Sequence, residues 1–303
     1  FILPKMRFIA LLLSCVTACS ICGGELGGFL KNGNNSCSYV HIKQPQGEVF
    51  PSPAPFNGCD DKGSQSLGIP RTAKSQTNHN LFFMTGTGGR IFSVAFGSGQ
   101  QQDWAALPSS YNFTVGLEYL ENLGLFMLTT SDLYVVKAAT EKDPSTRVLE
   151  HVATMHQLLG SDLSQDAVLT SNENFPFLFV VDGVNVITID LSGASPIASS
   201  HKMVALSRVM DLAVWCKDTT NITSLLALEN YKLYTLDQTT GASTFIMDIP
   251  DGSGFPRVND IFGDTFFFSD FDKLYTVSVS TATVLTNASF DGALLVSNFK
   301  FHL

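Results

Sequence analysis

Charged side chains are scarce in this sequence, and basic ones especially so. Asp, Glu, Lys and Arg make up 15% of the 303 residues, against roughly 25% in an average soluble domain. The 27 acidic residues outnumber the 18 basic ones, which gives a net charge of −9 at pH 7. Phosphate contacts from Lys and Arg supply most of the affinity for nucleic acids. Because the chain has no basic cluster, we expect no nucleic-acid partner.

Long apolar runs are also missing, apart from one near the N-terminus. A membrane-spanning helix needs about 20 predominantly apolar residues, so a multi-pass membrane protein is excluded and no membrane span is expected. Disorder is excluded as well, because 45% of the residues are apolar and 24 are Phe. The length suits one large domain or two ordinary ones with a sizeable core.

The one apolar run, Phe8–Val16, follows a basic residue and precedes a short stretch of small residues. This order is typical of a secretory signal peptide, so residues 6–20 are predicted to be one, with Met6 as the natural start. The sequence around Cys19 also loosely fits a bacterial lipobox, which would place a lipid anchor on that cysteine. A buried N-terminal helix is a third reading. In the first two readings the protein leaves the cytosol, and we expect a secreted, extracellular location.

The cysteine count agrees with an oxidising compartment. Removal of residues 6–20 leaves four cysteines, and four is an even number that permits three pairings. A disulfide between Cys37 and Cys59 is the preferred pairing, because it would brace a Pro/Gly-rich segment over residues 21–77. Such a bond would stabilise the fold by about 3 kcal/mol. A zinc site is disfavoured, since no Cys-x-x-Cys pair survives the cleavage. The four remaining cysteines are Cys22, Cys37, Cys59 and Cys216.

A hairpin pattern recurs five times from about residue 78 onward. Each copy has a short apolar run, a polar turn, and a second run that alternates with period two. The second runs are spaced by 42, 53, 47 and 41 residues, and repeats of this length with strand-forming residues are typical of β-propeller blades. We therefore predict an all-β fold, a β-propeller over residues 78–303, with a two-sheet sandwich as the competing architecture. The residues that anchor the copies are Phe92, Tyr134, Ile187, Tyr234 and Tyr275.

Five blades can be read in full, and a sixth in part. The stretch 291–296 looks like one more inner strand with no hairpin after it. Cys37–Ile42 or Glu48–Phe50 could supply the missing strands, which would hide the sheet edges where the ring closes. We therefore predict six blades, the closing one partial or shared between the termini; the alternative is that the sequence is a fragment. Residues 143–159 read equally well as a helix or as an outer strand with a loop insertion.

Three short motifs resemble known propeller families. Leu233–Asp237, followed by Thr240 and Gly241, is similar to the "LYxxD…TG" strand and turn of many secreted propellers. Phe267–Asp270 resembles the YWTD-type blade of lipoprotein-receptor propellers, and Arg257–Ile261 resembles the Asn-Asp strand of gluconolactonase-like (SMP-30) propellers. The resemblance covers roughly residues 78–290 and implies an architecture shared across superfamilies.

Acidic residues precede the apolar runs at comparable places in four of the repeats. In a propeller these stretches should be innermost strands that converge on the central channel, where carboxylates and Asn259 could bind Ca²⁺, which takes six to eight oxygen ligands. In a gluconolactonase-like enzyme that ion would polarise a lactone carbonyl. The order of motifs departs from that family, because Asp211 precedes Asn259. In the alternative reading, the acids cap contacts between blades by accepting backbone N–H groups. The acids are Glu118, Asp166, Asp211 and Asp260.

Two functions remain open at this stage. The first is a secreted, non-catalytic module that binds an extracellular protein or glycan. The second is a calcium-dependent SMP-30/gluconolactonase-like hydrolase of lactones or esters. The sequence favours the first, because no ordered ligand set can be assembled and no G-x-S-x-G, H-E-x-x-H or Walker motif is present. Four N-x-[ST] sequons, close to the number that chance produces, are candidate glycosylation sites: Asn34, Asn112, Asn221 and Asn287.

Overall fold

The structure is a computed structural model, and it describes the chain in segments. These are residues 25–32, 36–43, 48–57, 71–75, 80–84, 90–95, 98–107, 113–137, 147, 149–172, 174–216, 224–249, 256–270, 273–289, 294–295 and 300–302. The predicted signal peptide over residues 6–20, Cys19, Cys22 and Cys59 lie outside the described residues, as do the sequons at Asn34, Asn112 and Asn221.

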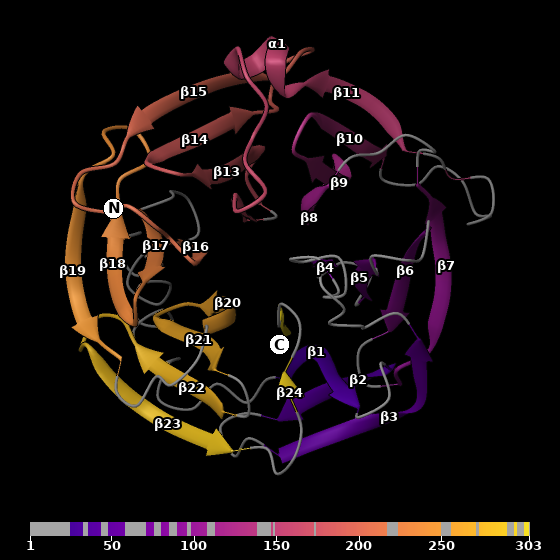
Figure 1. Ribbon diagram of the computed structural model, residues 1–303. Coiled ribbons are helices and arrows are strands. Elements are labelled where there is room, and N and C mark those ends of the chain that lie inside the picture. The colour runs from indigo at the N-terminus through magenta and orange to yellow at the C-terminus, as the bar shows by residue number, and fades with distance from the viewer. Residues whose placement is uncertain are drawn as a thin grey trace, which may run out of the picture.

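Within the described residues, six antiparallel sheets surround a common axis (Figure 1). The molecule is a β-propeller, as the repeat predicts. Five sheets are blades of four strands that follow one another in chain order, and each blade runs from an innermost to an outermost strand. Blade 1 comprises β4 (Arg71–Ser75), β5 (Asn80–Met84), β6 (Arg90–Ala95) and β7 (Gln101–Ala106); blade 2, β8 (Thr114–Leu120), β9 (Gly124–Thr129), β10 (Asp132–Lys137) and β11 (Glu150–Thr154); blade 3, β12 (Val168–Ser171), β13 (Phe177–Asp182), β14 (Asn185–Asp190) and β15 (Ile197–Lys202); blade 4, β16 (Asp211–Trp215), β17 (Ser224–Glu229), β18 (Lys232–Leu236) and β19 (Ser243–Asp248); blade 5, β20 (Pro256–Phe262), β21 (Thr265–Asp270), β22 (Lys273–Ser278) and β23 (Thr283–Ser289).

The sixth sheet joins the two ends of the chain. The N-terminal strands β1 (Glu25–Asn32), β2 (Ser36–Lys43) and β3 (Glu48–Asn57) form most of it, and both β24 (Leu294–Leu295) and β25 (Lys300–His302) pair with β1. The predicted shared closing blade is therefore confirmed.

The predicted boundary at residue 78 needs a correction. Residues 21–77 were read as a Pro/Gly-rich segment ahead of the propeller, yet they contain β1 to β4, which belong to two of its blades. Proline argues against a central strand because it cannot donate to the ladder, but it is tolerated at a sheet edge. The prolines at 51, 53 and 55 lie in β3, the outermost strand of the closing blade.

The innermost strands contact one another around the axis. Strand β4 packs beside β8, β8 beside β12, β12 beside β16, and β16 beside β20. Strand β25 then contacts both β20 and β4, which completes the ring. One blade has two apolar faces that it cannot cover by itself, so this stacking of neighbours is what buries them.

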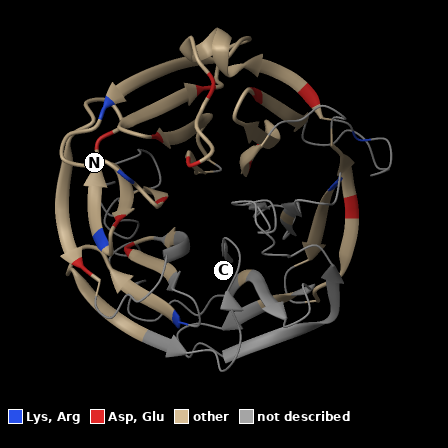
Figure 2. Cartoon of the chain, viewed as in Figure 1, with Lys and Arg blue, Asp and Glu red and all other residues tan. Residues whose placement is uncertain are grey.

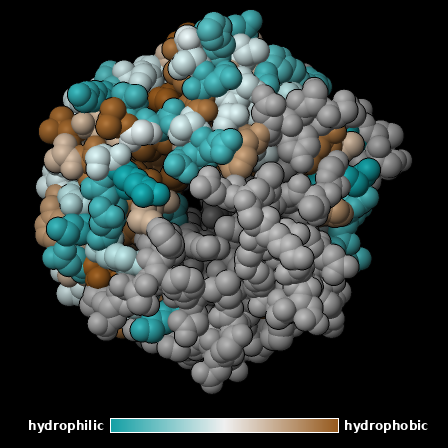
Figure 3. Space-filling model, in the orientation of Figure 1, coloured by the Kyte–Doolittle hydropathy of each residue, from teal (hydrophilic) through white to brown (hydrophobic). Residues whose placement is uncertain are grey.

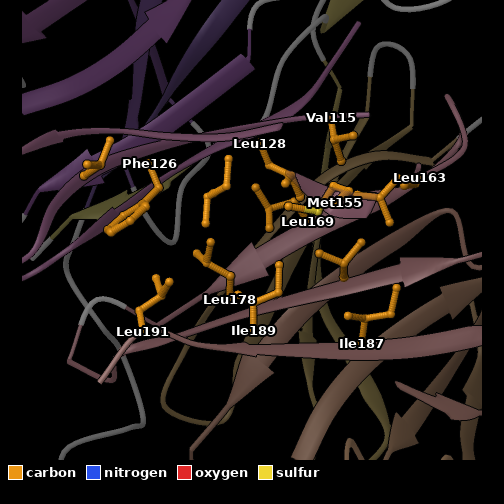
Figure 4. Packing of buried hydrophobic residues seen from close by; sticks show 14 of the residues in the cluster. Val115, Phe126, Leu128, Met155, Leu163, Leu169, Leu178, Ile187, Ile189 and Leu191 are labelled. Atoms are coloured by element: carbon orange, nitrogen blue, oxygen red, sulfur yellow. The ribbon is translucent and has the colours of Figure 1, made fainter. Parts of the chain in front are cut away.

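The hydrophobic core lies between blades. Every residue of β9 and β17 is buried, as expected for strands covered on both faces, whereas the outer strand β15 is largely exposed. Figure 4 shows one cluster in which side chains from blades 2 and 3 face each other, among them Phe126, Leu128, Leu178 and Ile189. The five predicted hairpins coincide with the second and third strands of blades 1 to 5.

A short helix, α1 (Met155–Leu159), follows β11 directly. The Thr154 side chain accepts from the Gln157 N–H, and the Gln157 side chain accepts from the Thr154 N–H, which is a complete capping box. Gly160 ends the helix at φ +79°. Residues 143–159, which the sequence predicted to be either a helix or an outer strand, contain both strand β11 and helix α1. Among the described residues, no helix is long and apolar enough to cross a bilayer.

Candidate functional site

Three of the four predicted acids lie on innermost strands. Glu118 is in β8, Asp211 begins β16, and Asp260 is in β20, whereas Asp166 is exposed in the turn before β12. The expected placement on innermost strands is thus confirmed for these three acids and is wrong for Asp166 (Figure 1). The aromatic anchors lie on the third strand of their blades: Phe92, Tyr134, Tyr234 and Tyr275.

These three acids do not share one level along the channel. Glu118 is opposite Phe126, the third residue of β9, and Asp260 is opposite Phe267, the third residue of β21. The two therefore occupy equivalent positions in blades 2 and 5, on opposite sides of the ring. Asp211 is opposite the fifth residue of β17, which displaces it along the axis by about 7 Å, or two strand residues. Figure 2 shows the described acidic residues spread over several blades.

Glu118 connects two blades. Its side chain is only 5% exposed, and its Oε2 accepts a hydrogen bond of 2.8 Å from the Ser171 hydroxyl in β12. A buried carboxylate is costly unless protein donors satisfy it. The Ser171 hydroxyl supplies one such donor from the next blade.

Blades 3 and 4 are joined in a related way. The Asn172 side-chain amide, just past β12, donates to the Cys216 sulfur, just past β16, at 3.6 Å. Asp211 is 8% exposed, and its Oδ1 accepts the Leu212 N–H at 2.9 Å. These contacts agree with the reading of the inner-strand acids as caps within the fold.

Two further acids were missed in the sequence, and both hold the connection between blades. Glu229 ends β17, and its Oε1 accepts the N–H groups of Ser207 at 2.7 Å and Arg208 at 2.6 Å. Asp182 ends β13 and accepts the backbone N–H and the hydroxyl of Ser164. An acid that closes the apolar run of the second strand was the pattern that could have revealed them.

The acid of the "LYxxD…TG" motif forms a turn. Asp237 Oδ1 accepts the Thr239 hydroxyl and N–H, both at 2.7 Å, and the Thr240 N–H at 3.1 Å. These hydrogen bonds, the Thr239 hydroxyl first, lower the pKa of the Asp237 carboxyl, because they favour its charged form. The motif therefore marks a structural turn at the rim of blade 4.

No metal centre is formed by the side chains that the structure describes: no three of their His, Cys, Asp and Glu residues come together as ligands. The side chains of Asn259 and Asp260 are not among them, so the calcium site stays a prediction. The same holds for the Cys37–Cys59 disulfide and for glycosylation at Asn287, whose side chains are likewise outside the described part.

A groove of about 590 Å³ opens between blades 2 and 3. Its floor is apolar and includes Phe126 of β9 and Leu191, which follows β14. Figure 4 shows both side chains in the cluster between the two blades. On the face shown in Figure 3, the described hydrophobic and hydrophilic residues are intermingled. The groove is lined by Leu123, Phe126, Val135, Glu150, His151, Val152, Ala153, Gln157, Leu158, Leu191, Gly193, Ala194, Ser195 and Pro196.

His151 at the rim of the groove is held by the neighbouring strand. Its Nε2 lies 3.1 Å from Asp132 Oδ1, and the Ser131 hydroxyl donates to Asp132 Oδ2 at 2.6 Å. The Tyr134 ring packs edge-on against the imidazole at 5.6 Å. Burial, and then the nearby Asp132 charge, raise the pKa of the Tyr134 hydroxyl. These contacts fix β11 against β10.

No family model and no curated protein sequence matches this chain. Solved structures do match it, at 10% identity each. One chain of a nidogen/laminin complex superposes with a TM-score of 0.65, covering 93% of this chain and 99% of that one. The chain therefore has a β-propeller fold. Apo AztD from Citrobacter koseri superposes with a TM-score of 0.56, covering 92% of this chain and 89% of that one. A luciferin-regenerating enzyme superposes with a TM-score of 0.53, covering 76% of this chain and 78% of that one. These likenesses confirm the resemblance to the propeller superfamilies and, at this identity, show the fold alone.

Proposed function

We propose that the protein is an extracellular β-propeller that binds another protein. The observation that carries this proposal is the use made of the inner-strand carboxylates. Glu118 accepts a hydroxyl from the neighbouring blade and Asp211 accepts a backbone N–H. The Glu118 contact links blades 2 and 3, whereas the Asp211 contact is local to β16, and a binding module needs nothing further from these carboxylates.

A protein partner and an extracellular location are supported separately. The structural neighbour with a TM-score of 0.65 comes from a complex of two proteins, nidogen and laminin. The N-terminal sequence supports export, because a basic residue, an apolar run and small residues follow in the order of a signal peptide. Fold alone does not decide function, since propellers host both binding and catalysis.

A panel of purified extracellular proteins immobilised on sensor surfaces tests the proposal. We expect saturable binding to at least one member, with an affinity unchanged by a calcium chelator. Turnover of lactones or esters that requires calcium, together with no binding to the panel, would contradict it.

A calcium-dependent hydrolase is the second candidate. The supporting observation is that Glu118 and Asp260 occupy equivalent positions in opposite blades, and the luciferin-regenerating enzyme is a propeller neighbour with a catalytic name. Calcium at 100 times its Kd should then stabilise the protein by about 2.7 kcal/mol. Asp260→Asn should abolish the resulting rise in Tm, while Asp166→Asn, in an exposed turn, should leave it intact. An unchanged Tm in the wild type contradicts this candidate.

A further inference from the structure

We infer that strand β15, the outer edge of blade 3, pairs with the same strand of a second copy of this chain. The two copies form a dimer with two-fold symmetry through one antiparallel β15–β15 contact. The inference goes beyond the proposed function and does not depend on it. What carries it is a regular, exposed edge strand that has serines at its centre and exposed apolar side chains near both ends.

The outer edges of the blades differ in regularity. Within the described residues, the outermost strands are β3, β7, β11, β15, β19 and β23. Such edges present unpaired N–H and C=O groups to other chains, and proteins protect them with bulges, prolines and charges. All of these strands except β15 shift register once against the neighbouring strand, and β3 carries three prolines as well. Strand β15 pairs with β14 in unbroken register, which leaves a straight edge suited to an added strand.

Strand β15 is accessible at the rim of the ring (Figure 1). No strand of the described chain pairs with it on the side away from β14. Helix α1 contacts β15, but Ala198 of the strand and Leu158 of the helix pack against the core between blades 2 and 3. The other exposed positions keep the edge open to a second strand. They are Ile197, Ser199, Ser200 and Lys202.

Exposed apolar side chains near both ends of the strand favour a second copy as the partner. Ile197 at its start is 69% exposed, and Val204, just past its end, is 62% exposed. In an antiparallel pair the start of one strand lies beside the end of the other. When Ser200 lies on the two-fold axis and faces its own copy, Ile197 is opposite Met203 of the second copy, next to Val204. Symmetry then makes this apolar contact twice, because an isologous interface uses the same patch on both subunits.

The same register brings no like charges together. Like charges directly opposite each other destabilise a strand pair, and here a small uncharged serine faces its own copy. Lys202 lies opposite Ala198 of the second copy. The two Lys202 positions are about 13 Å apart along the strands, which exceeds the screening length of about 8 Å at physiological salt. A strand with a lysine or a carboxylate at its centre would not pair with itself in this way.

The Val204 end of the contact is already ordered. The Val204 N–H donates to the Gly241 carbonyl at 2.8 Å, and the Val204 carbonyl accepts the Ser243 hydroxyl at 2.6 Å. An ordered surface loses little conformational entropy when it associates. Blade 4 therefore holds this apolar position in place for a partner.

Sedimentation velocity of the full chain over a concentration series tests the inference. Ser200→Lys places a like charge opposite its own copy, and Thr244→Lys, exposed on the register-shifted strand β19, is its matched control. Ile197→Ser removes the apolar end contact, and Leu285→Ser, exposed on β23, is the control for that change. Circular dichroism melting of each variant separates loss of the dimer from loss of the fold.

Oxidative crosslinking tests the register directly. Opposite Cα atoms in an antiparallel pair lie about 4.5–5.5 Å apart, within the range of roughly 4.4–6.8 Å that a disulfide spans. Ser200→Cys should therefore give a covalent dimer under mild oxidation, and Thr244→Cys should not. Equal crosslinking of these two variants would contradict the register.

We expect the wild type and the two exposed controls to dimerise with equal affinity. Ser200→Lys should weaken the dimer on the order of tenfold or more, because juxtaposed like charges oppose association, and Ile197→Ser should weaken it about tenfold. A wild type that stays monomeric over the whole series overturns the inference, as does equal dimerisation of Ser200→Lys and Thr244→Lys. If the wild type is monomeric and a protein of the panel binds it but not Ser200→Lys, the edge takes a foreign strand; the second copy is then wrong and the proposed function stands.

Discussion

Replacement of Gly241 by alanine should disrupt the contact between blades 3 and 4. Gly241 lies in the turn between β18 and β19 at φ +72°. A Cβ there would lie 2.2 Å from the Lys202 carbonyl oxygen and 2.8 Å from its carbonyl carbon, and both atoms are backbone. The neighbouring chain cannot simply retreat, because the Val204 N–H donates to the Gly241 carbonyl at 2.8 Å and the Ser243 hydroxyl donates to the Val204 carbonyl at 2.6 Å.

The cost of this substitution has three parts. A left-handed conformation costs an L-residue about 1–2 kcal/mol, and the overlap forces shifts of the kind that cost about 1–3 kcal/mol in overpacked cores. Loss of the Val204–Gly241 hydrogen bond adds about 1 kcal/mol. We expect the free energy of unfolding to fall by about 3–6 kcal/mol. At about 2 °C per kcal/mol for a chain of this size, Tm should fall by about 6–12 °C.

Gly183→Ala is the matched control. Gly183 also lies in a tight turn of the propeller, at φ +57°, but nothing lies within 4 Å of the position its Cβ would take. It should therefore show only the conformational part of the cost, about 1–2 kcal/mol. Thermal and guanidinium unfolding followed by circular dichroism measures both variants. If Gly241→Ala melts no lower than Gly183→Ala, the argument from the blade contact is wrong.

Two more predictions concern carboxylates. Glu118→Ala leaves the Ser171 hydroxyl without the hydrogen bond seen in the wild type and should lower the free energy of unfolding by about 1–3 kcal/mol. A double-mutant cycle with Ser171→Ala should give a coupling energy of about 0.5–3 kcal/mol. Strictly additive effects of the two substitutions would disprove the bridge between blades. The lowered pKa of Asp237 means that its contribution to stability is complete above the unfolded value of 3.8 and is lost as the pH falls through the folded value. Asp237→Asn should therefore lower Tm at pH 7 and flatten the fall of Tm with acid below pH 3.8; parallel curves for variant and wild type would refute the assignment.

The second and third strands of each blade could be predicted because burial on both faces leaves an uninterrupted apolar run. Leu225–Leu228 and Leu233–Leu236 were read in this way and lie in β17 and β18. Only the first residues of strand β3, Glu48–Phe50, were read as a possible strand, because the prolines that follow are compatible with a strand only at an outer edge, and a sequence does not state where the edge lies. The closing blade was predicted from the stretch 291–296 together with Cys37–Ile42 or Glu48–Phe50 as strands from the N-terminal segment.

Register was the part of the site that the sequence could not provide. The stretches Arg208–Leu212 and Arg257–Ile261 look alike, which suggested equivalent positions for Asp211 and Asp260. The strand pairing instead places Asp260 opposite the third residue of β21 and Asp211 opposite the fifth residue of β17, so that Asp260 matches Glu118. Register depends on the pairing with the neighbouring strand, and no local pattern announces it.

The pairing of β1 with β24 and β25 has a consequence for synthesis on the ribosome. Strands β1 to β3 are translated first, but the inner partners of β1 come from residues 294–302, almost a full chain length later. The closing blade, whose strands β1 to β3 are synthesised first, therefore stays incomplete while the other blades are translated. Contacts of such long sequence separation form slowly and leave intermediates with unsatisfied strands. A nascent chain of this protein should depend on chaperones until its last strand emerges, and ribosome-bound chains arrested before residue 294 should be more sensitive to protease in β1 to β3 than released protein.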